Sequence, residues 1–199
     1  PVDPNPDRYD GFRRHVLITQ FTSCECTYCP NAIASLIDYF KANTSGDAIH
    51  AGVHVAIPSA DNMVNLSSLA IKNMMVITTA PTLAYDLDKE TRNKSLTSNI
   101  AANVKDIEKA VAKRLALVTA TTTQIQINAG VKVSVDGDYR ISAWLLEDGI
   151  KETQINGTGI SGYDFNTHNN VVRAISNVGY VPGDPLGADG SLTKGESAR

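Results

Sequence analysis

Thr22-Ser23-Cys24-Glu25-Cys26-Thr27-Tyr28-Cys29-Pro30 is the stretch that decides the fold, and it holds all three cysteines of the chain. An apolar run at 16–21 precedes it, and apolar residues at helical spacing follow it, at positions 33, 36, 37 and 40. A proline directly after the last cysteine suits the first turn of a helix, where no backbone N–H is needed. The pattern therefore predicts a strand, a Cys-x-x-Cys turn and a helix.

This placement predicts reactive sulfur chemistry. The first turn of a helix offers free N–H groups and the positive end of the helix dipole, and both favour a thiolate over a thiol. Cys26 is the expected attacking thiol of a disulfide exchange, and Cys29 is the expected resolving thiol. A structural disulfide and a metal site remain open as alternatives. No fourth ligand has a convincing spacing to the three cysteines, so no metal site is predicted.

Cys24 is left over if Cys26 and Cys29 pair. Free cysteines are usually buried and behave as small apolar residues, which is the expected role of Cys24. A second resolving thiol is the alternative.

Composition narrows the function classes. The chain has 199 residues, 42% of them hydrophobic, which allows a sizeable core. A formal net charge of −3, without a basic stripe, argues against nucleic acid as a partner. No apolar run approaches the ~20 residues that span a bilayer. No signal peptide is recognised, so the chain is expected to begin after processing or to be a trimmed part of a longer protein. No cofactor is predicted.

The chain divides into four predicted parts. They are a proline-rich linker at 1–12, an α/β domain at 13–117, an antiparallel β domain at 118–181 and a flexible, glycine-rich tail at 182–199. Residues 13–57 are predicted to form a βαβ unit whose second strand is 48–57. On such a strand His50 and His54 lie ~13 Å apart and are expected to be partly exposed rather than a metal pair.

Later segments of the α/β domain carry weaker signals. A short helix at 63–73 is expected to turn Leu66 inward, and a strand at 74–82 is expected to run into a proline. The stretch 85–99 is polar and irregular. A helix is predicted from Asn103, as a capping start, to about Leu117.

Alternation with period two dominates from residue 118 to residue 150. Asp136-Gly137 between two alternating runs predicts a β-hairpin, within a unit of about three strands. Trp144 is expected to be a packing residue. Residues 168–175 fit either a strand or a short helix, and His168 and Arg173 are expected to be structural.

The order of these elements resembles the thioredoxin fold, in which a proline that follows a later strand is cis and packs against the disulfide. Ala80-Pro81-Thr82 matches that position. The resemblance implies that Pro81 guards the sulfur pair and that the backbone of Ala80 pairs with a substrate strand. Tyr28, inside the motif, is expected to shield the sulfurs or contact a partner, or else to be a surface aromatic. The expected fold class is therefore α/β, a thioredoxin-like domain with an appended antiparallel β unit.

A narrower resemblance is to the family related to the 28-kilodalton outer-membrane protein of anaerobic Gram-negative bacteria. It rests on residues 16–22 with Cys-x-x-Cys-Pro, on 147–150 with Gln154, and on 168–173. The resemblance implies a cell-envelope location, as an outer-membrane lipoprotein or in the periplasm. Membrane contact is then expected only through an N-terminal lipid anchor outside this sequence.

Three residues depart from these families. Gln20 stands where reductive thioredoxins have a buried Asp that moves the proton of the resolving thiol, and the narrower family often has Glu there. Glu25 replaces the usual Trp before the motif, and its charge opposes a thiolate at Cys26. Asn170 replaces the usual second His after His168, which weakens a metal site there.

Two functions follow from these residues. One is a cell-envelope thiol–disulfide oxidoreductase that acts on protein thiols or disulfides through Cys26, Cys29 and Pro81. The other is a non-catalytic surface module that uses the scaffold to bind protein or glycan. The fold alone does not decide between them.

Overall fold

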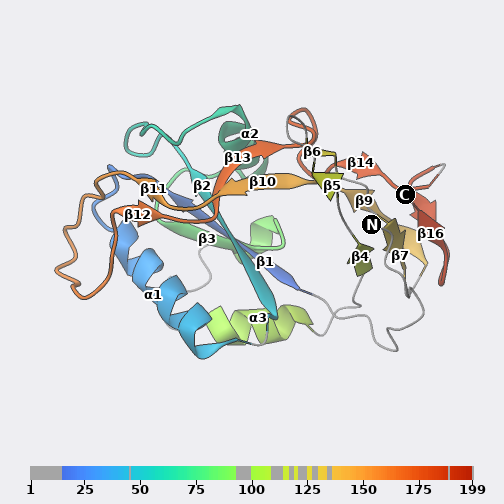
Figure 1. The fold of residues 1–199 in the computed structure, drawn as a ribbon, viewed down its shortest axis with the longest axis horizontal. Coiled ribbons are helices and arrows are strands. Elements are labelled where there is room, and N and C mark those ends of the chain that lie inside the picture. The colour runs from blue at the N-terminus through green and yellow to red at the C-terminus, as the bar shows by residue number, and fades with distance from the viewer. Residues whose placement is uncertain are drawn as a thin grey trace.

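The computed structural model describes residues 15–44, 46–92, 100–108, 114–116, 119–120, 125–126, 130–133, 136–187 and 189–198. Its main feature is a five-stranded sheet in the order β10-β13-β2-β1-β3 (Figure 1). The strands are β1 (Val16–Thr22), β2 (Ala48–His54), β3 (Thr82–Tyr85), β10 (Trp144–Glu147) and β13 (Val171–Ile175). The predicted linker at 1–12 lies outside the described residues.

The βαβ unit is confirmed. Strand β1 leads through the cysteine turn into helix α1 (Cys29–Ala42), and β2 returns parallel to β1, with Val16 opposite Ala48 and Thr22 opposite His54. Pro30 lies in the first turn of α1, as predicted. Six of the seven residues of β1 are buried, because helices cover both faces of the sheet at this point.

The segment before Pro81 corrects the prediction of a strand at 74–82. Its first residues instead end helix α2 (Leu66–Met75), which begins at Asn65 with a capping box and ends at Val76 in the left-handed conformation. The Ala80–Pro81 bond is cis, and strand β3 begins only after it. Leu66, expected inward, is 80% exposed because it is the first residue of the helix and faces away from the sheet.

The next helix also departs from its predicted bounds. Helix α3 (Ile100–Glu108) starts before Asn103, which is therefore an interior residue and not a cap. The predicted helix was expected to reach Leu117, but Arg114–Ala116 form strand β4. The short 3-10 helix η2 (Lys89–Thr91) falls in the stretch expected to be irregular.

Two late strands complete the central sheet. Strand β13 is parallel to β2, with Val171 opposite Gly52, and β10 is antiparallel to β13. The expectation that 118–181 forms a β unit of its own is therefore wrong for these strands. Residues 168–175 are strand rather than helix, as β12 (Thr167–His168) and β13, and β12 pairs with β11 (Ile150–Lys151). Trp144 packs against the core of the sheet, as expected.

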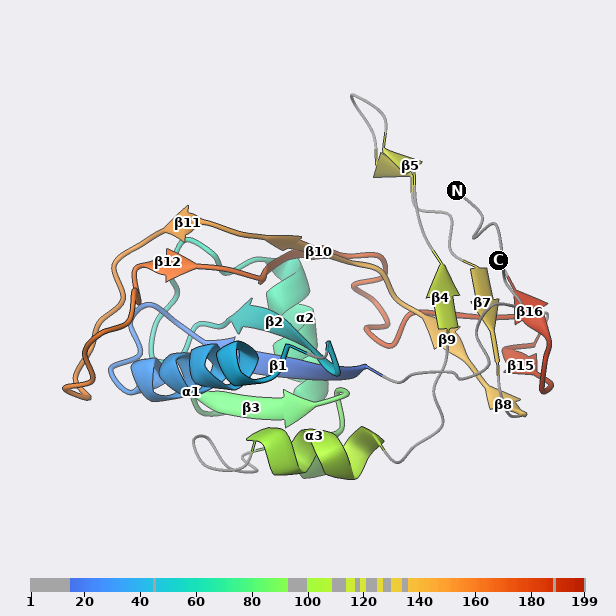
Figure 2. The ribbon, with the colours of Figure 1, turned by 60° about the horizontal axis from the view of Figure 1, so that its bottom comes forward.

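Short antiparallel strand pairs are appended at one end of the sheet (Figure 2). They involve β5 (Thr119–Ala120), β6 (Ile125–Gln126), β7 (Gly130–Lys132), β8 (Gly137–Asp138), β9 (Arg140–Ile141), β14 (Asp184–Pro185), β15 (Ser191–Leu192) and β16 (Ser197–Ala198). Strand β7 pairs with β4 and β16, while β8 and β9 pair with β15 and β14. The predicted Asp136-Gly137 hairpin is thus wrong, because the strands on its two sides pair with other partners.

The C-terminal residues form part of this appended unit. The expectation of a flexible tail at 182–199 is corrected by β14, β15 and β16, and by the burial of Leu186 and Leu192. These two side chains pack with Val131, Val133 and Tyr139. The tail has few apolar residues, but Leu186 and Leu192 are buried in the small core of the appended unit.

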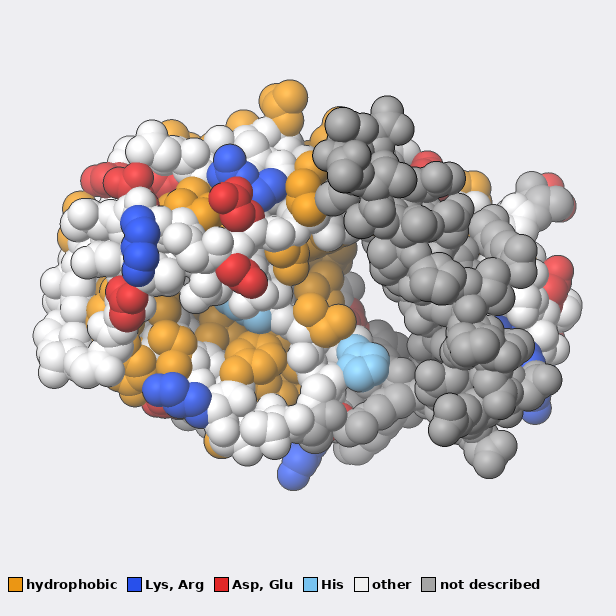
Figure 3. Space-filling model, in the orientation of Figure 1, with side chains coloured by type: hydrophobic (Ala, Val, Ile, Leu, Met, Phe, Trp, Pro, Cys, Tyr) orange, Lys and Arg blue, Asp and Glu red, His pale blue; other side chains and the backbone are white. Residues whose placement is uncertain are grey.

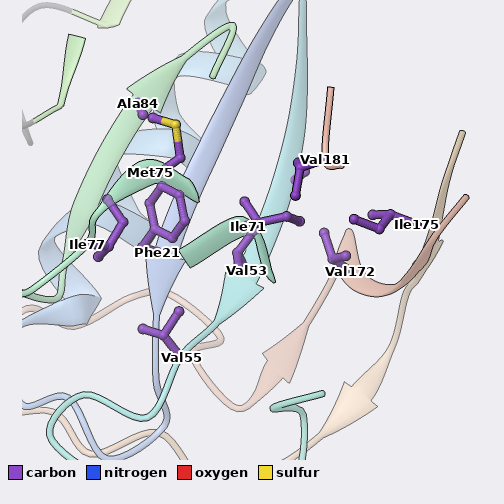
Figure 4. Packing of buried hydrophobic residues seen from close by; sticks show 11 residues of the cluster. Phe21, Val53, Val55, Ile71, Met75, Ile77, Ala84, Val172, Ile175 and Val181 are labelled. Atoms are coloured by element: carbon purple, nitrogen blue, oxygen red, sulfur yellow. The ribbon is translucent and has the colours of Figure 1, made fainter. Parts of the chain in front are cut away.

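Hydrophobic clusters cover both faces of the central sheet. On one face, Phe21 and Val53 pack against Ile71 and Met75 of α2 (Figure 4). The other face packs against α1 and α3 through residues that include Ile18, Ala32, Leu36, Leu83 and Val104. This three-layer arrangement fixes the end of β1, where the cysteine motif begins.

Candidate functional site

Cys26 and Cys29 form a disulfide, with Cα atoms 5.4 Å apart, between the end of β1 and the start of α1. The turn is closed by the backbone, since the amide of Cys26 donates to the carbonyl of Ser23 and the amide of Cys29 donates to that of Cys26. Both sulfur-bearing residues are buried, with 3% of Cys26 and none of Cys29 exposed. The predicted pair is therefore brought together, beneath the molecular surface.

The helix start supplies the expected electrostatic environment. Tyr28 is the N-cap of α1 and makes no side-chain capping bond, and the first turn has no acidic residue. The free amides and the helix dipole therefore favour a thiolate on the reduced motif. Glu25 lies exposed on the other side of Cys26, where its charge opposes that effect. Tyr28 itself is 64% exposed, which matches a surface aromatic available for contact.

A later segment covers the motif. Residues 152–168, called the strap from here on, pass over the turn, and the amides of Ile155 and Gly157 donate to the carbonyls of Cys24 and Thr27 at 2.9 and 3.0 Å. This backbone pairing resembles the addition of one more short strand. A side chain at position 157 would collide with Thr27, because a Cβ there would lie 2.1 Å from its Cγ2. Glycine is therefore what allows the strap to approach so closely.

The buried side chain of Gln154 connects the strap to the cysteine turn by hydrogen bonds. Its buried amide group donates to the carbonyls of Ser23, Cys24 and Cys26 at 3.3, 3.0 and 3.0 Å. Each of these carbonyls also accepts from a backbone amide, that of Cys26, Ile155 or Cys29, so Gln154 adds a second contact to a turn that lies outside the sheet. Sequence reasoning noticed Gln154 only through the family resemblance, because nothing local indicates that it reaches a turn about 130 residues earlier.

The cis proline lies beside the strand that carries the motif. Thr82, directly after Pro81, is opposite Phe21 in the antiparallel pairing of β3 with β1. Ala80 is half-buried and packs against the cluster that contains Phe21. The expected position of the cis bond is confirmed, while the guarding role of Pro81 and the substrate-pairing role of Ala80 stay predictions.

Gln20 lies at the floor of a cavity of about 210 Å³ between α1 and the segment at 165–170. Its Oε1 lies 3.1 Å from Nε2 of His50, which donates to it, while its own Nε2 has no partner among the described residues. Burial lowers the pKa of His50 to about 4, partly opposed by Asp148, so this histidine is neutral at pH 7. In Figure 3 a histidine lies recessed among hydrophobic side chains on the face in view. Gln20 does not ionise, so it cannot perform the proton transfer of the carboxylate found there in reductive thioredoxins.

Cys24 lies in a polar cluster that sequence reasoning missed. It is fully buried, as predicted, but His54, Asp61 and His168 surround its thiol. His54 was expected to be partly exposed and is only 2% exposed, because β2 ends beneath the loop that carries Asp61. Arg173 forms an exposed ion pair with Glu147 at 3.1 Å, and its structural role stays a prediction.

The groups of this cluster differ in how readily they ionise. Burial opposes ionisation of Asp61, but hydrogen bonds from His54 and from the amides of Cys24 and Met63 outweigh it, and its pKa is about 2. Burial and the neighbouring Asp61 carboxylate raise the pKa of the Cys24 thiol, and burial lowers the pKa of His168. The cluster therefore holds a thiol beside a carboxylate.

No family model and no curated protein matches the chain. Two solved structures are similar to it. HBP35 of Porphyromonas gingivalis is 19% identical with a TM-score of 0.64, and 94% of this chain covers 64% of that one. Protein AGR_C_4864 from Agrobacterium tumefaciens is 11% identical with a TM-score of 0.56, and the match covers 94% of this chain and 78% of that one.

At these identities the similarity concerns the fold. The chain has a thioredoxin-like core with an appended antiparallel β unit, as predicted. It spans less than two thirds of the HBP35 chain. Among the described residues, no helix is both long and apolar enough to cross a bilayer.

Proposed function

We propose that this chain is a thiol–disulfide oxidoreductase-like module of the cell envelope, acting on protein thiols or disulfides through Cys26 and Cys29. The observation that carries the proposal is the disulfide at the uncapped start of α1, directly after the central strand β1. The envelope location, in the periplasm or on a lipid-anchored protein, rests on the family resemblance of residues 16–22, 147–150 and 168–173.

The reaction is an exchange of one disulfide for another. In the reduced protein the Cys26 thiolate attacks one sulfur of a partner disulfide, and the other partner sulfur leaves as a thiolate. The Cys29 thiolate then attacks Cys26 Sγ, breaks the mixed disulfide and releases the second partner thiolate. The partner gains two electrons and the protein disulfide is formed. The reverse sequence oxidises a partner dithiol.

Access is the step that the strap controls. With 3% of Cys26 exposed, an attacking thiolate reaches its sulfur only after a neighbouring segment moves, and the strap, which bonds to the carbonyls of Cys24 and Thr27, is the segment that we propose to move. Loss of the Gln154 side chain removes the two N–H donors that the carbonyls of Ser23, Cys24, Cys26 and Ile155 share, and favours an open strap. The proposal therefore includes movement of residues 152–168 before exchange.

A test of access compares two substitutions in the strap. We expect Gln154→Ala to increase the rate at which dithiothreitol reduces the disulfide by about tenfold, the effect of ~1.4 kcal/mol less strap closure. Asn156→Ala is the matched control, because the side chain of Asn156 bonds to Thr158 and Ile160 of the strap and, among the described residues, to no part of the cysteine turn. Equal rates in both variants and the wild type would show that the strap does not limit access.

The decisive measurement is the reduction potential of the Cys26–Cys29 pair, with Cys24→Ser as background. Alkylation and mass spectrometry in graded glutathione buffers should give a value between about −270 and −120 mV, the range of exchange proteins. Cys26→Ser should abolish insulin reduction, while Cys24→Ser, two residues away, should retain it. Full insulin-reducing activity in Cys26→Ser would overturn the mechanism.

A non-catalytic binding module is the second candidate, and the burial of both sulfurs favours it. Here the disulfide is structural and the appended β unit binds protein or glycan. A potential below about −300 mV, together with no insulin reduction by either Cys24→Ser or the Gln154→Ala variant, would establish this reading over the first.

A further inference from the structure

Four potential metal ligands converge beside the disulfide without belonging to it. Cys24 lies in the turn two residues after β1, His54 ends β2, Asp61 lies in the loop that follows, and His168 ends β12. Ligand atoms of Cys24, His54 and Asp61 all lie within 4.8 Å of one another, and Nε2 of His168 is 3.5 Å from Cys24 Sγ. Each of the four side chains is more than nine-tenths buried.

We propose that Cys24, His54, Asp61 and His168 form a binding site for a divalent transition metal ion of the zinc class. One thiolate, two imidazoles and one carboxylate are the ligand types that zinc takes in tetrahedral sites, whereas calcium and magnesium select oxygen ligands. Binding displaces the thiol proton of Cys24 to solvent and involves no change of oxidation state.

The ligand atoms of Cys24, His54 and Asp61 are close enough together for one ion, and Nε2 of His168 approaches this group from the side of Cys24. Bonds of about 2.0–2.3 Å in a tetrahedron place neighbouring ligand atoms roughly 3.3–3.7 Å apart. The distance of 3.5 Å between Cys24 Sγ and His168 Nε2 already has this value. His54 Nδ1 and Asp61 Oδ2 are 2.7 Å apart in a hydrogen bond, so ligation through Nδ1 moves its proton to Nε2 of the same ring, or to solvent if the ring was charged, and moves the two atoms slightly apart.

Surrounding groups hold the ligands in place. The amide of Met63 donates to Asp61 Oδ1 at 2.9 Å, and the amide of Cys24 donates to Oδ2 at 2.8 Å. The ring of His54 meets the ring of His168 edge to face, with centroids 5.3 Å apart. Nε2 of His168 is also 3.2 Å from the carbonyl of Glu152, so ligation through this atom exchanges that bond for the metal. Such outer contacts orient ligands and tune affinity.

An ion here joins separate parts of the chain. Cys24 and His54 belong to the central βαβ unit, whereas His168 is the last residue of the strap. Metal binding therefore holds the strap over the motif, independently of whether Cys26 and Cys29 react. The inference does not depend on the proposed redox function, because it is tested with the disulfide intact.

Cobalt(II) titration of the full chain, with Cys26 and Cys29 oxidised, tests the site. We expect one equivalent to bind, with a thiolate-to-cobalt charge-transfer band and visible bands of tetrahedral intensity, and Zn²⁺ to displace it. Cys24→Ser should remove the charge-transfer band. His54→Gln and His168→Gln should each weaken cobalt binding by about tenfold to a hundredfold.

His50→Gln is the matched control, since His50 lies on the same strand as His54 but outside the cluster. It should leave the cobalt affinity within about twofold. Circular dichroism of each variant separates loss of the site from loss of the fold, and the His168→Gln variant, at the edge of the cluster, keeps the test valid if Cys24→Ser unfolds. No binding by the wild type, or a charge-transfer band that persists in folded Cys24→Ser, would overturn the proposal and leave a hydrogen-bonded cluster only.

Discussion

The central sheet and the appended β unit are stabilised in different ways. Strands β1 and β2 pair over seven residues and are covered by helices on both faces, so a cluster of eleven buried residues forms on the α2 side alone. Among the residues that the structure describes, the appended unit consists of strand pairs of two or three residues, and five buried side chains form its core. Extended pairing with burial gives the first region stability of its own, whereas the second depends on a few side chains.

Chain connectivity increases the difference. The central βαβ unit closes through contacts between near neighbours in the sequence, which cost little loop entropy. In the appended unit, β7 pairs with β16. Val131 lies opposite Ala198, although most of the C-terminal half of the chain separates these two residues in the sequence. This unit is complete only when the last residues are in place, so it is expected to open first.

A pair of core truncations gives the largest expected effect. Phe21→Ala should lower the free energy of unfolding by about 3–5 kcal/mol, because the ring is fully buried between Val53, Ile71 and Met75. Leu192→Ala should cost about 2 kcal/mol, at the low end for a buried leucine, and should affect the appended unit alone.

Hydrogen exchange with mass spectrometry distinguishes the two. In Leu192→Ala, amides of β7, β15 and β16 should exchange faster while those of β1 and β2 keep their protection. Phe21→Ala should accelerate exchange in both regions. Equal acceleration of β1 and β16 by Leu192→Ala would show that the two regions unfold as one cooperative unit.

Sequence reasoning was accurate where the determinants are local. The apolar run before the cysteines, the proline after them and the helical spacing beyond them act within one or two turns, and they correctly placed β1, the Cys26–Cys29 turn and α1. The position of the cis proline came from resemblance. Strand 74–82 failed because Met74 and Met75 are equally compatible with a buried helix end, and Asn65 with Ser68 decides for the helix.

Contacts between distant segments could not be predicted in this way. Nothing near Val171 indicates that it pairs with Gly52, and nothing near His168 indicates that it lies against Cys24. Alternating residues around Asp136-Gly137 favoured a hairpin because the tail's competing strands carry little periodicity of their own. Non-local pairing also produced the strap and the polar cluster, which are the parts of the site that sequence reasoning missed.

Acid should weaken the central sheet before the appended unit. In the folded state the pKa of His50 is about 4, below its ordinary value of 6.5. The part of the unfolding free energy that depends on neutral His50 is therefore fully present above pH 6.5 and is lost as the pH falls toward 4. At about 1.4 kcal/mol per pKa unit, the loss is up to about 3 kcal/mol. Chemical denaturation of the wild type between pH 7 and 4.5 should show this slope.

His50→Gln is the control for that titration, since glutamine keeps a polar side chain near Gln20 and Asn170 but takes up no proton in this range. Its stability should vary clearly less with pH over the same interval. A slope identical to that of the wild type would assign the acid sensitivity to other groups, such as His168.

The smallest effect is expected at the contact between α2 and the late strand β13. Asn65 caps α2 by accepting from the amide of Ser68 at 3.0 Å, and its Nδ2 donates to the carbonyl of Val172 at 2.8 Å. Asn65→Ala should cost about 1 kcal/mol through the lost cap. Asn65→Asp keeps the accepting oxygen of the cap but replaces the Nδ2 donor to the carbonyls of Val172 and Met63 with a second oxygen, so a smaller loss of unfolding free energy in Asn65→Asp than in Asn65→Ala would assign the larger share to the cap. If Asn65→Asp is as destabilised as Asn65→Ala, the bond that joins the early and late halves of the sheet, and not the helix cap, is what Asn65 contributes.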